Sequence, residues 1–226
     1  MAPPGPPGTP EAAFAAGRRA DAATIADALA RVGTANLSDA CHHRPGLRGI
    51  VCRTPGLRMA GPAVTVRTAP GDWNRAVLAI DQTPPGGVLA IDAGGVPPAV
   101  WGGLATLTAK RAGLAGVVVY GAIRDSREAT AMGLPLFSAQ VCPDAGDPKG
   151  YGEIGARIAL AGQTVEPGDW LVGDDDGVLV LPRAQAVEYV NRALDVVESE
   201  SRLRAEIERG ASLASVARLD KWDRWG

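Results

Sequence analysis

Residues 86–125 read GGVLAIDAGGVPPAVWGGLATLTAKRAGLAGVVVYGAIRD, and this stretch decides the fold. The apolar run within residues 86–95 predicts a buried strand, and residues 116–121 predict a second one. Between them, residues 100–113 predict a helix with glycines near its start and two basic residues near its end, as the helix dipole favours. A strand, a helix and a strand in this order indicate a βαβ unit with parallel strands.

The sequence on either side of this unit continues the α/β pattern. Before it, the spacing of apolar residues predicts helices at residues 21–32 and 70–81 and an alternating strand at residues 63–68. After it, we expect a strand at residues 134–140, then short β segments broken by Pro-Gly and Asp-Gly turns, and last a long charged helix over residues 182–210. The pattern therefore predicts one α/β domain with a β-rich layer and a long C-terminal helix that can reach a neighbouring subunit.

The composition limits the function classes that are open to this chain of 226 residues. A formal net charge of −2 shows no basic excess, so we expect no nucleic-acid partner. No apolar run approaches the roughly 20 residues of a bilayer span, so we expect no membrane partner. Three cysteines without CxxC spacing suit a reducing cytoplasm better than a disulfide framework or a zinc ribbon.

The chain divides into two parts by composition. Residues 1–20 are rich in Pro, Gly and Ala, and we expect them to be a disordered tail. We expect residues 21–226 to form a single domain that includes the C-terminal helix.

An arginine and an aspartate, Arg124 and Asp125, come just after the strand at residues 116–121. Ligand sites in open α/β sheets gather beyond the carboxyl ends of the strands. Asp125 offers a hard oxygen ligand for Mg²⁺ or Mn²⁺, and Arg124 offers donors that match a carboxylate or an enolate oxygen. The alternative is a surface arginine beside an aspartate that caps a short helix beginning at Ser126. The spacing alone leaves both interpretations open.

Other short motifs carry weaker signals. A helix that begins near Gly102 would expose unpaired backbone N–H groups and so form an anion site, although ordinary turn chemistry is the alternative. Ser38 and Asp39 suit capping, or a site near a helix start. The acidic stretch at residues 174–177 is better interpreted as a hairpin turn than as a metal cluster.

Six blocks of the chain, taken together, resemble the family that contains regulator of ribonuclease activity A and the metal-dependent 4-hydroxy-4-methyl-2-oxoglutarate/4-carboxy-4-hydroxy-2-oxoadipate aldolases. The blocks are TANLSDA, GPAVTV, PGDWNRAVLAIDQTPPGGVLAIDAGG, VWGGLATLTAKRAGLAGVVVYGAIRD, GLPLFSAQ and VEPGDWLVGDDDGVLVLP. The resemblance covers about residues 34–213. It implies a ββα swivelling-type α/β domain with a mixed sheet, assembled as a homotrimer or hexamer with active sites between subunits.

The resemblance also implies an activity and a set of site residues. Asp125 would ligate Mg²⁺ or Mn²⁺, and Arg124 would hold the keto or enolate oxygen of a pyruvyl group. The backbone at the helix start, at Gly103, Leu104 and Ala105, would bind the pyruvyl carboxylate. The implied reaction cleaves a C–C bond of a 4-hydroxy-2-oxo acid and releases pyruvate, with oxaloacetate decarboxylation as a side activity.

A neighbouring subunit completes the metal site in this family through a glutamate of its C-terminal helix. Glu200 is the best match for that glutamate, and Glu198 is a weaker one.

The chain departs from the aldolase pattern at Gly103, twenty-one positions before Arg124, where the aldolases carry an acidic residue. Asp92, Asp39 and Glu153 are the candidates to compensate, and the sequence does not place any of them at the site. Two other functions therefore stay open. One is a non-catalytic regulator or protein-binding ring, and the other is a specialised lyase that acts on another 2-oxo or hydroxy acid.

Overall fold

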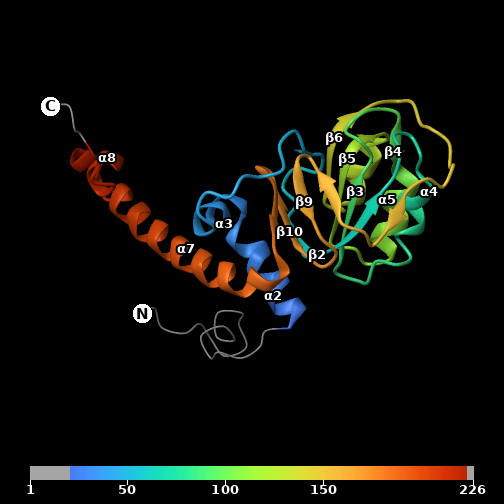
Figure 1. The fold of residues 1–226 in the computed structure, drawn as a ribbon. Helices are drawn as coiled ribbons and strands as arrows, with labels where there is room; N and C mark the ends of the chain where they lie inside the picture. Colours follow the sequence, from blue (N-terminus) through green and yellow to red (C-terminus); the bar gives the residue numbers. More distant parts are fainter. Residues whose placement is uncertain (1–20, 223–226) are drawn as a thin grey trace.

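The computed structural model describes residues 21–222, so the tail predicted at residues 1–20 lies outside the described residues. Figure 1 shows an α/β body at one end and a long helix that projects from it at the other. The strands are β1 (Val51–Cys52), β2 (Met59–Arg67), β3 (Val88–Asp92), β4 (Ala99–Trp101), β5 (Gly116–Ile123), β6 (Leu136–Val141), β7 (Glu153–Ile154), β8 (Ile158–Leu160), β9 (Gln163–Val165), β10 (Trp170–Asp174) and β11 (Gly177–Leu181). The helices are α2 (Ala22–Val32), α3 (Thr34–Ala40), α4 (Asn74–Leu78), α5 (Gly103–Arg111), α6 (Ser126–Met132), α7 (Ala186–Glu208) and α8 (Leu213–Val216), with 3₁₀ turns η1 (Arg183–Gln185) and η2 (Leu219–Trp222).

The predicted βαβ unit is confirmed as β3, α5 and β5. β3 and β5 pair in parallel, from Val88 opposite Gly116 to Asp92 opposite Tyr120. The mixed sheet has the order β1-β6-β5-β3-β2-β10-β11, with β4 on β5 and β7 on β2. β2, β3, β5 and β6 are parallel, and the predicted acidic turn joins β10 to β11 as an antiparallel hairpin on the far side of β2. The carboxyl ends of the parallel strands therefore meet at one edge.

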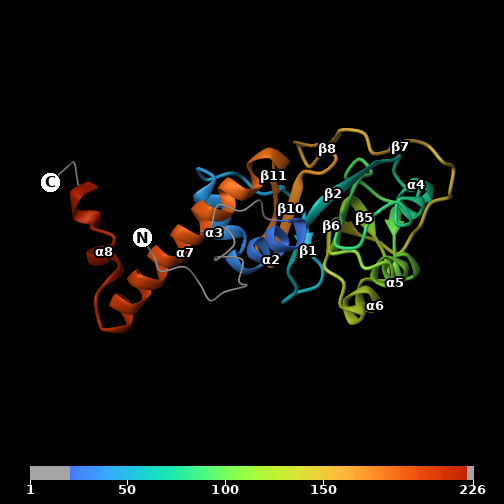
Figure 2. The ribbon, with the colours of Figure 1, turned by 90° about the horizontal axis from the view of Figure 1, so that it is seen from below.

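The two central strands are covered on both faces. Every residue of β3 except Asp92 is buried, and so is every residue of β5 except Tyr120. Helices α4, α5 and α6 cover one face, and Figure 2 shows them together at the end of the molecule away from α8. The segments β8 and β9 pack against the other face. Burial on both faces explains why these strands are continuous apolar runs rather than alternating ones.

Helices α2, α3 and α7 form a separate layer over the hairpin of β10 and β11. The predicted helix at residues 21–32 is confirmed, and the Asp21 carboxylate caps it by accepting a hydrogen bond from the Thr24 N–H at 2.8 Å. The prediction that Ser38 and Asp39 lie at a helix start is wrong, because α3 begins at Thr34. Its cap comes from a distant turn: the Asp174 carboxylate accepts hydrogen bonds from the N–H and hydroxyl of Thr34, at 2.8 and 2.6 Å.

The C-terminal helix changes environment along its length. Val190 and Ala193 in its first half are buried in the layer with α2 and α3. From Ser199 onward nearly every residue of α7 is exposed, and Figure 1 shows this half extending away from the body. Within the described residues, no helix combines the length and the apolar composition that a membrane crossing demands.

Helix α4 is shorter than predicted, since it covers Asn74–Leu78 rather than residues 70–81. The buried carboxylate of Asp72 determines its start by accepting a hydrogen bond from the Asn74 N–H. The same carboxylate accepts from the N–H groups of Lys149 and Tyr151, at 3.0 and 2.7 Å. Asp72 thus ties α4 to the loop that returns from β6. Burial alone would raise its pKa, but the backbone donors together outweigh burial and lower the pKa below its usual 3.8.

Replacing Asp72 by asparagine is expected to destabilise the fold at neutral pH by about 1–3 kcal/mol, because the side-chain amide cannot accept all of these buried hydrogen bonds. A carboxylate whose pKa is lowered on folding stabilises the folded state above the unfolded pKa, and this contribution is lost as pH falls through the folded pKa. In urea unfolding, the free energy of unfolding of the wild type should therefore exceed that of Asp72→Asn at pH 7, and this difference should shrink below about pH 4. Asp81→Asn, at an exposed carboxylate, is the control. Equal stability of the two variants would contradict the assigned role.

Candidate active site

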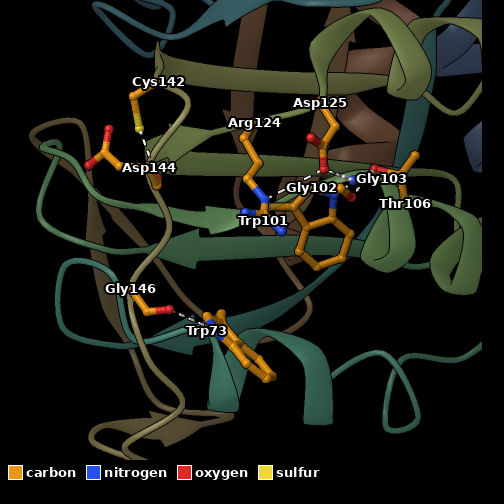
Figure 3. A network of polar contacts seen from close by, with 10 residues as sticks. All are labelled: Trp73, Trp101, Gly102, Gly103, Thr106, Arg124, Asp125, Cys142, Asp144 and Gly146. Atoms are coloured by element: carbon orange, nitrogen blue, oxygen red, sulfur yellow. Dashed lines mark hydrogen bonds and ion pairs between the residues drawn. The ribbon is translucent and has the colours of Figure 1, made fainter.

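The site lies where β5 ends and α5 and α6 begin (Figure 3). Arg124 and Asp125 follow Ile123, the last residue of β5. The Arg124 N–H donates to the carbonyl of Trp101, the last residue of the adjacent strand β4, at 2.9 Å. Both side chains are partly exposed, with 47% of the Arg124 side chain and 40% of the Asp125 side chain accessible. The pair is thus held by buried strands and still open to a ligand.

Asp125 occupies the N-cap position of α6, but its side chain makes no capping hydrogen bond to that helix within the described structure. Its Oδ2 instead accepts from the N–H of Gly103 at 3.0 Å, at the start of α5. The Arg124 Nε lies 3.6 Å from the same oxygen. The backbone of Asp125 has a φ of 56°, in the left-handed region that costs most residues energy. The helix-cap interpretation of Asp125 is therefore not supported by its contacts.

Two glycines allow the carboxylates to approach the start of α5. A Cβ at Gly102 would lie 2.8 Å from the Asp125 Oδ2. A Cβ at Gly103 would lie 2.7 Å from the Glu128 Oε2. Each glycine thus leaves space that an acidic side chain fills. Glycine is needed here because a Cβ would block the close approach of the carboxylate, and not because the backbone turns.

The first turn of α5 presents free backbone donors. The first backbone hydrogen bond of the helix runs from the Thr106 N–H to the Gly102 carbonyl, at 3.0 Å. The N–H of Gly103 donates to the Asp125 carboxylate. Among the described residues, no acceptor forms a hydrogen bond with the N–H of Leu104 or of Ala105. Unpaired N–H groups at a helix start attract anions. The structure thus leaves two of the predicted carboxylate-binding donors available.

Trp101 connects the two halves of the site. It is 2% exposed, and its ring Nε1–H donates to the Thr106 hydroxyl oxygen at 2.9 Å. The Thr106 hydroxyl in turn donates to the Gly102 carbonyl at 2.9 Å. Because the Trp101 carbonyl also accepts from Arg124, one buried residue positions the start of α5 relative to the end of β5.

Glu128 is the residue that the sequence analysis missed. It lies one turn after Asp125 on α6, and its carboxylate occupies the space beside the Gly103 backbone. Residues three apart on a helix share a face, so the spacing Arg-Asp-x-x-Glu was the signal that could have found it. An acidic group therefore stands next to position 103 even though residue 103 has no side chain.

The three candidates to compensate for Gly103 make contacts elsewhere. Asp92 accepts from the Gly94 N–H at 3.1 Å, Asp39 contacts His43 at 3.1 Å, and Glu153 pairs with Arg67. Glu200 belongs to the exposed second half of α7, and this half of the helix extends away from β5 and α6 of the same chain (Figure 2). A role for Glu200, or for Glu198, therefore requires a second copy of the chain.

Metal binding can be judged from the donor set. Among the described residues there is no group of three or more His, Cys, Asp and Glu side chains that could hold a metal ion. Asp125 and Glu128 nevertheless place two carboxylates against the adjacent backbones of Gly102 and Gly103. Mg²⁺ is commonly held by one or two carboxylates together with water, so this pair of hard oxygen donors fits Mg²⁺ or Mn²⁺.

An open pocket adjoins these carboxylates. It is lined by Asp125, Ser126, Arg127, Glu128 and Ala131 of α6 and its start, and by Val141, Cys142 and Pro143 at the end of β6. The Cys142 thiol contacts the Asp144 carbonyl at 3.4 Å, and burial together with Asp144 raises its pKa (Figure 3). A thiol with a raised pKa is a poor nucleophile, so covalent cysteine catalysis does not suit this pocket.

Comparisons with known proteins agree with the fold. A family model described as RraA-like, Aldolase/RraA, matches residues 34–180. A Halalkalibacterium halodurans protein whose name proposes 4-hydroxy-4-methyl-2-oxoglutarate aldolase activity is 41% identical over 138 residues, which cover 60% of this chain and 65% of that protein.

Two solved structures extend the comparison. An uncharacterised protein from Pseudomonas syringae pv. tomato str. DC3000 has a TM-score of 0.79 at 31% identity, covering 88% of this chain and 95% of that one. The RNA-processing inhibitor RraA from Thermus thermophilis has a TM-score of 0.61 at 32% identity, covering 66% of this chain and 92% of that one. With residues 34–180 matched by the family model, the chain belongs to the RraA-like family of aldolases and RraA proteins.

Proposed function

We propose that this chain is a divalent-metal-dependent lyase that cleaves a C–C bond of a 4-hydroxy-2-oxo acid and releases pyruvate. One observation carries the proposal: Arg124, the Asp125 carboxylate and the free N–H groups of α5 converge, with Glu128 beside Gly103. A relative named for 4-hydroxy-4-methyl-2-oxoglutarate aldolase activity supports the same reaction class.

Each group has a part in binding a 2-oxo acid. The N–H groups of Leu104 and Ala105 would bind the carboxylate of the pyruvyl end, because a helix start favours anions. Arg124 would donate to the keto oxygen beside that carboxylate. When the C–C bond breaks, this oxygen gains the negative charge of an enolate, and a preorganised guanidinium stabilises that charge more than it stabilises the substrate.

Asp125 and Glu128 would hold Mg²⁺ or Mn²⁺ beside the same keto oxygen. The bound cation supplies a Lewis acid that polarises the carbonyl. Decarboxylation of oxaloacetate also forms pyruvate enolate, so we propose it as a side activity of the same site.

Assembly belongs to the same proposal. We propose a homotrimer or hexamer in which Glu200 of one copy approaches the Asp125 of another. The support is the second half of α7, which is exposed from Ser199 onward and projects from its own body. A polar helix that projects from its own body can bridge to another folded unit.

Pyruvate release tests the proposal directly. Purified chain is expected to release pyruvate from 4-hydroxy-4-methyl-2-oxoglutarate and from oxaloacetate with Mg²⁺ or Mn²⁺. Chelation should lower the rate by at least about 100-fold, because the Lewis acid is lost, and added metal should restore it. Metal-matched samples without protein correct for the spontaneous decarboxylation of oxaloacetate. Full activity after chelation would contradict a metal-dependent mechanism.

A non-catalytic regulator is the second candidate. Gly103 lacks the acid of the aldolase pattern, and a solved relative is titled an RNA-processing inhibitor. This candidate predicts no turnover of any 2-oxo acid with any divalent metal. A specialised lyase would instead show metal-dependent release of a product other than pyruvate from a different 2-oxo or hydroxy acid, so product analysis separates the three.

A further inference from the structure

A chain of hydrogen bonds runs from the protein interior to the start of α5 (Figure 3). It begins at Trp101 and Thr106, which are 2% and 0% exposed. The Trp101 ring N–H donates to the Thr106 hydroxyl oxygen at 2.9 Å, and this hydroxyl donates to the Gly102 carbonyl at 2.9 Å. The Thr106 backbone N–H donates to the same carbonyl at 3.0 Å. One buried threonine therefore holds the Gly102 carbonyl through two hydrogen bonds.

The same peptide unit continues the chain to Asp125. The Gly102 carbonyl and the Gly103 N–H belong to one planar trans peptide, in which the two groups point in opposite directions. Fixing the carbonyl therefore also fixes the direction of the N–H, which donates to the Asp125 Oδ2 at 3.0 Å. Hydrogen bonds that a peptide carbonyl accepts polarise the unit and strengthen the bond that its N–H donates.

This hydrogen bond restrains a carboxylate that packing alone leaves open, since 40% of the Asp125 side chain is accessible. The Arg124 Nε lies 3.6 Å from the same oxygen, Oδ2, and no described residue donates a hydrogen bond to Oδ1. The Arg124 N–H is itself held by the Trp101 carbonyl, at 2.9 Å. One oxygen of Asp125 is thus fixed, and the other is free to face a ligand in a defined direction.

We propose that Trp101 and Thr106 are positioning residues that aim the Asp125 carboxylate at a divalent cation. They act through the peptide between Gly102 and Gly103 and touch neither substrate nor cation. The inference rests on the proposed function only in taking Asp125 as a cation ligand. Partners that orient a ligand from behind typically contribute about 10- to 100-fold to metal affinity.

The alternative is that Thr106 only stabilises α5, because threonine hydroxyls often bond to the carbonyl four residues earlier in a helix. Thr83 provides the matched case, since its buried hydroxyl donates to the Ala79 carbonyl at 2.7 Å. Thr83→Val and Thr106→Val thus remove the same kind of buried hydrogen bond and keep the side-chain shape. Of the two hydroxyls, the one on Thr106 bonds to a peptide that contacts Asp125.

Mn²⁺ binding followed by electron paramagnetic resonance tests the proposal, at a temperature where thermal unfolding shows each variant to be folded. Thr106→Val is expected to raise the Mn²⁺ dissociation constant at least about tenfold, whereas Thr106→Ser, which keeps the hydroxyl, should stay within about twofold of wild type. Trp101→Phe should raise the constant less than Thr106→Val does, because Thr106 keeps its bond to Gly102. Thr83→Val should leave the constant unchanged. If Thr106→Val does not fold, Trp101→Phe decides.

The measurement needs no turnover, so it separates this inference from the proposed function. A loss of Mn²⁺ affinity in Thr106→Val that Thr106→Ser restores supports the positioning role even if no 2-oxo acid is cleaved, in which case only the lyase proposal fails. The positioning role would be overturned by any of three results: no Mn²⁺ binding in the wild type, unchanged affinity in both Thr106→Val and Trp101→Phe, or an equal loss in Thr83→Val.

Discussion

Replacing Asp125 by alanine is expected to lower kcat/KM for pyruvate release by about 1,000-fold, because the change removes the carboxylate that Arg124 and the start of α5 share. Most of the loss should appear in kcat, since the donors of Leu104 and Ala105 that bind the pyruvyl carboxylate remain in place. Arg124 would then stabilise the enolate without the cation beside it. Pyruvate release at saturating Mg²⁺ measures this effect.

The same variant should remain folded. The Asp125 side chain is 40% accessible and accepts one backbone hydrogen bond, so its loss should cost about 1 kcal/mol or less. Thermal unfolding of Asp125→Ala checks this point, and Asp144→Asn, at an exposed acid outside the pocket lining, is the activity control. Mn²⁺ binding followed by electron paramagnetic resonance should weaken in Asp125→Ala. Unchanged Mn²⁺ binding together with full turnover would remove Asp125 from the mechanism.

The central unit of the fold could be predicted from the sequence because its signals are local. The runs at β3 and β5 are apolar throughout, and α5 has glycines before it and Lys110 and Arg111 in its last turn. The position of Arg124 and Asp125 at the strand end followed from the same reasoning. These predictions needed only the periodicity of one segment and the rule that strand ends carry ligand sites.

The parts that could not be predicted depend on contacts between distant segments. The start of α3 is capped by Asp174, which lies 140 positions after Thr34. The start of α4 depends on Asp72 and on a loop near Tyr151. Asp72 lies next to α4, but its other partners near Tyr151 and the Asp174 cap of α3 lie outside any window of sequence around these helices, so propensity and spacing placed the two helix starts wrongly.

The missing acid at Gly103 shows a second reason why the site could not be predicted in full from the sequence. Sequence comparison asks which residue occupies a position, whereas the proposed chemistry requires a carboxylate at a place in space. Glu128 supplies one from another helix, 25 positions further along the chain, because α5 and α6 lie side by side. The departure from the aldolase pattern at Gly103 therefore does not by itself argue for a lost activity.

The position of the Glu128 carboxylate beside Gly103 predicts a second large effect on pyruvate release. Replacing Glu128 by alanine is expected to lower kcat/KM for pyruvate release by about 100-fold, because one of the two carboxylates that suit the cation is lost. Gly103→Asp alone should give no gain. Its Cβ would lie 2.7 Å from the Glu128 Oε2, and a third carboxylate would add repulsion next to Asp125. Steady-state pyruvate release for each single variant measures both effects.

The double variant Gly103→Asp with Glu128→Ala is expected to recover to within about tenfold of wild type, because it moves the acid from α6 to α5 and clears the space that the new side chain needs. Gly103→Ala with Glu128→Ala is the matched control, since it fills the same space without a carboxylate and should stay as impaired as Glu128→Ala. If the aspartate rescues and the alanine does not, the site requires an acid at this place in space and accepts it from either helix. Equal activities of the two double variants would show that an acid at position 103 cannot replace Glu128, and full activity of Glu128→Ala alone would remove Glu128 from the chemistry.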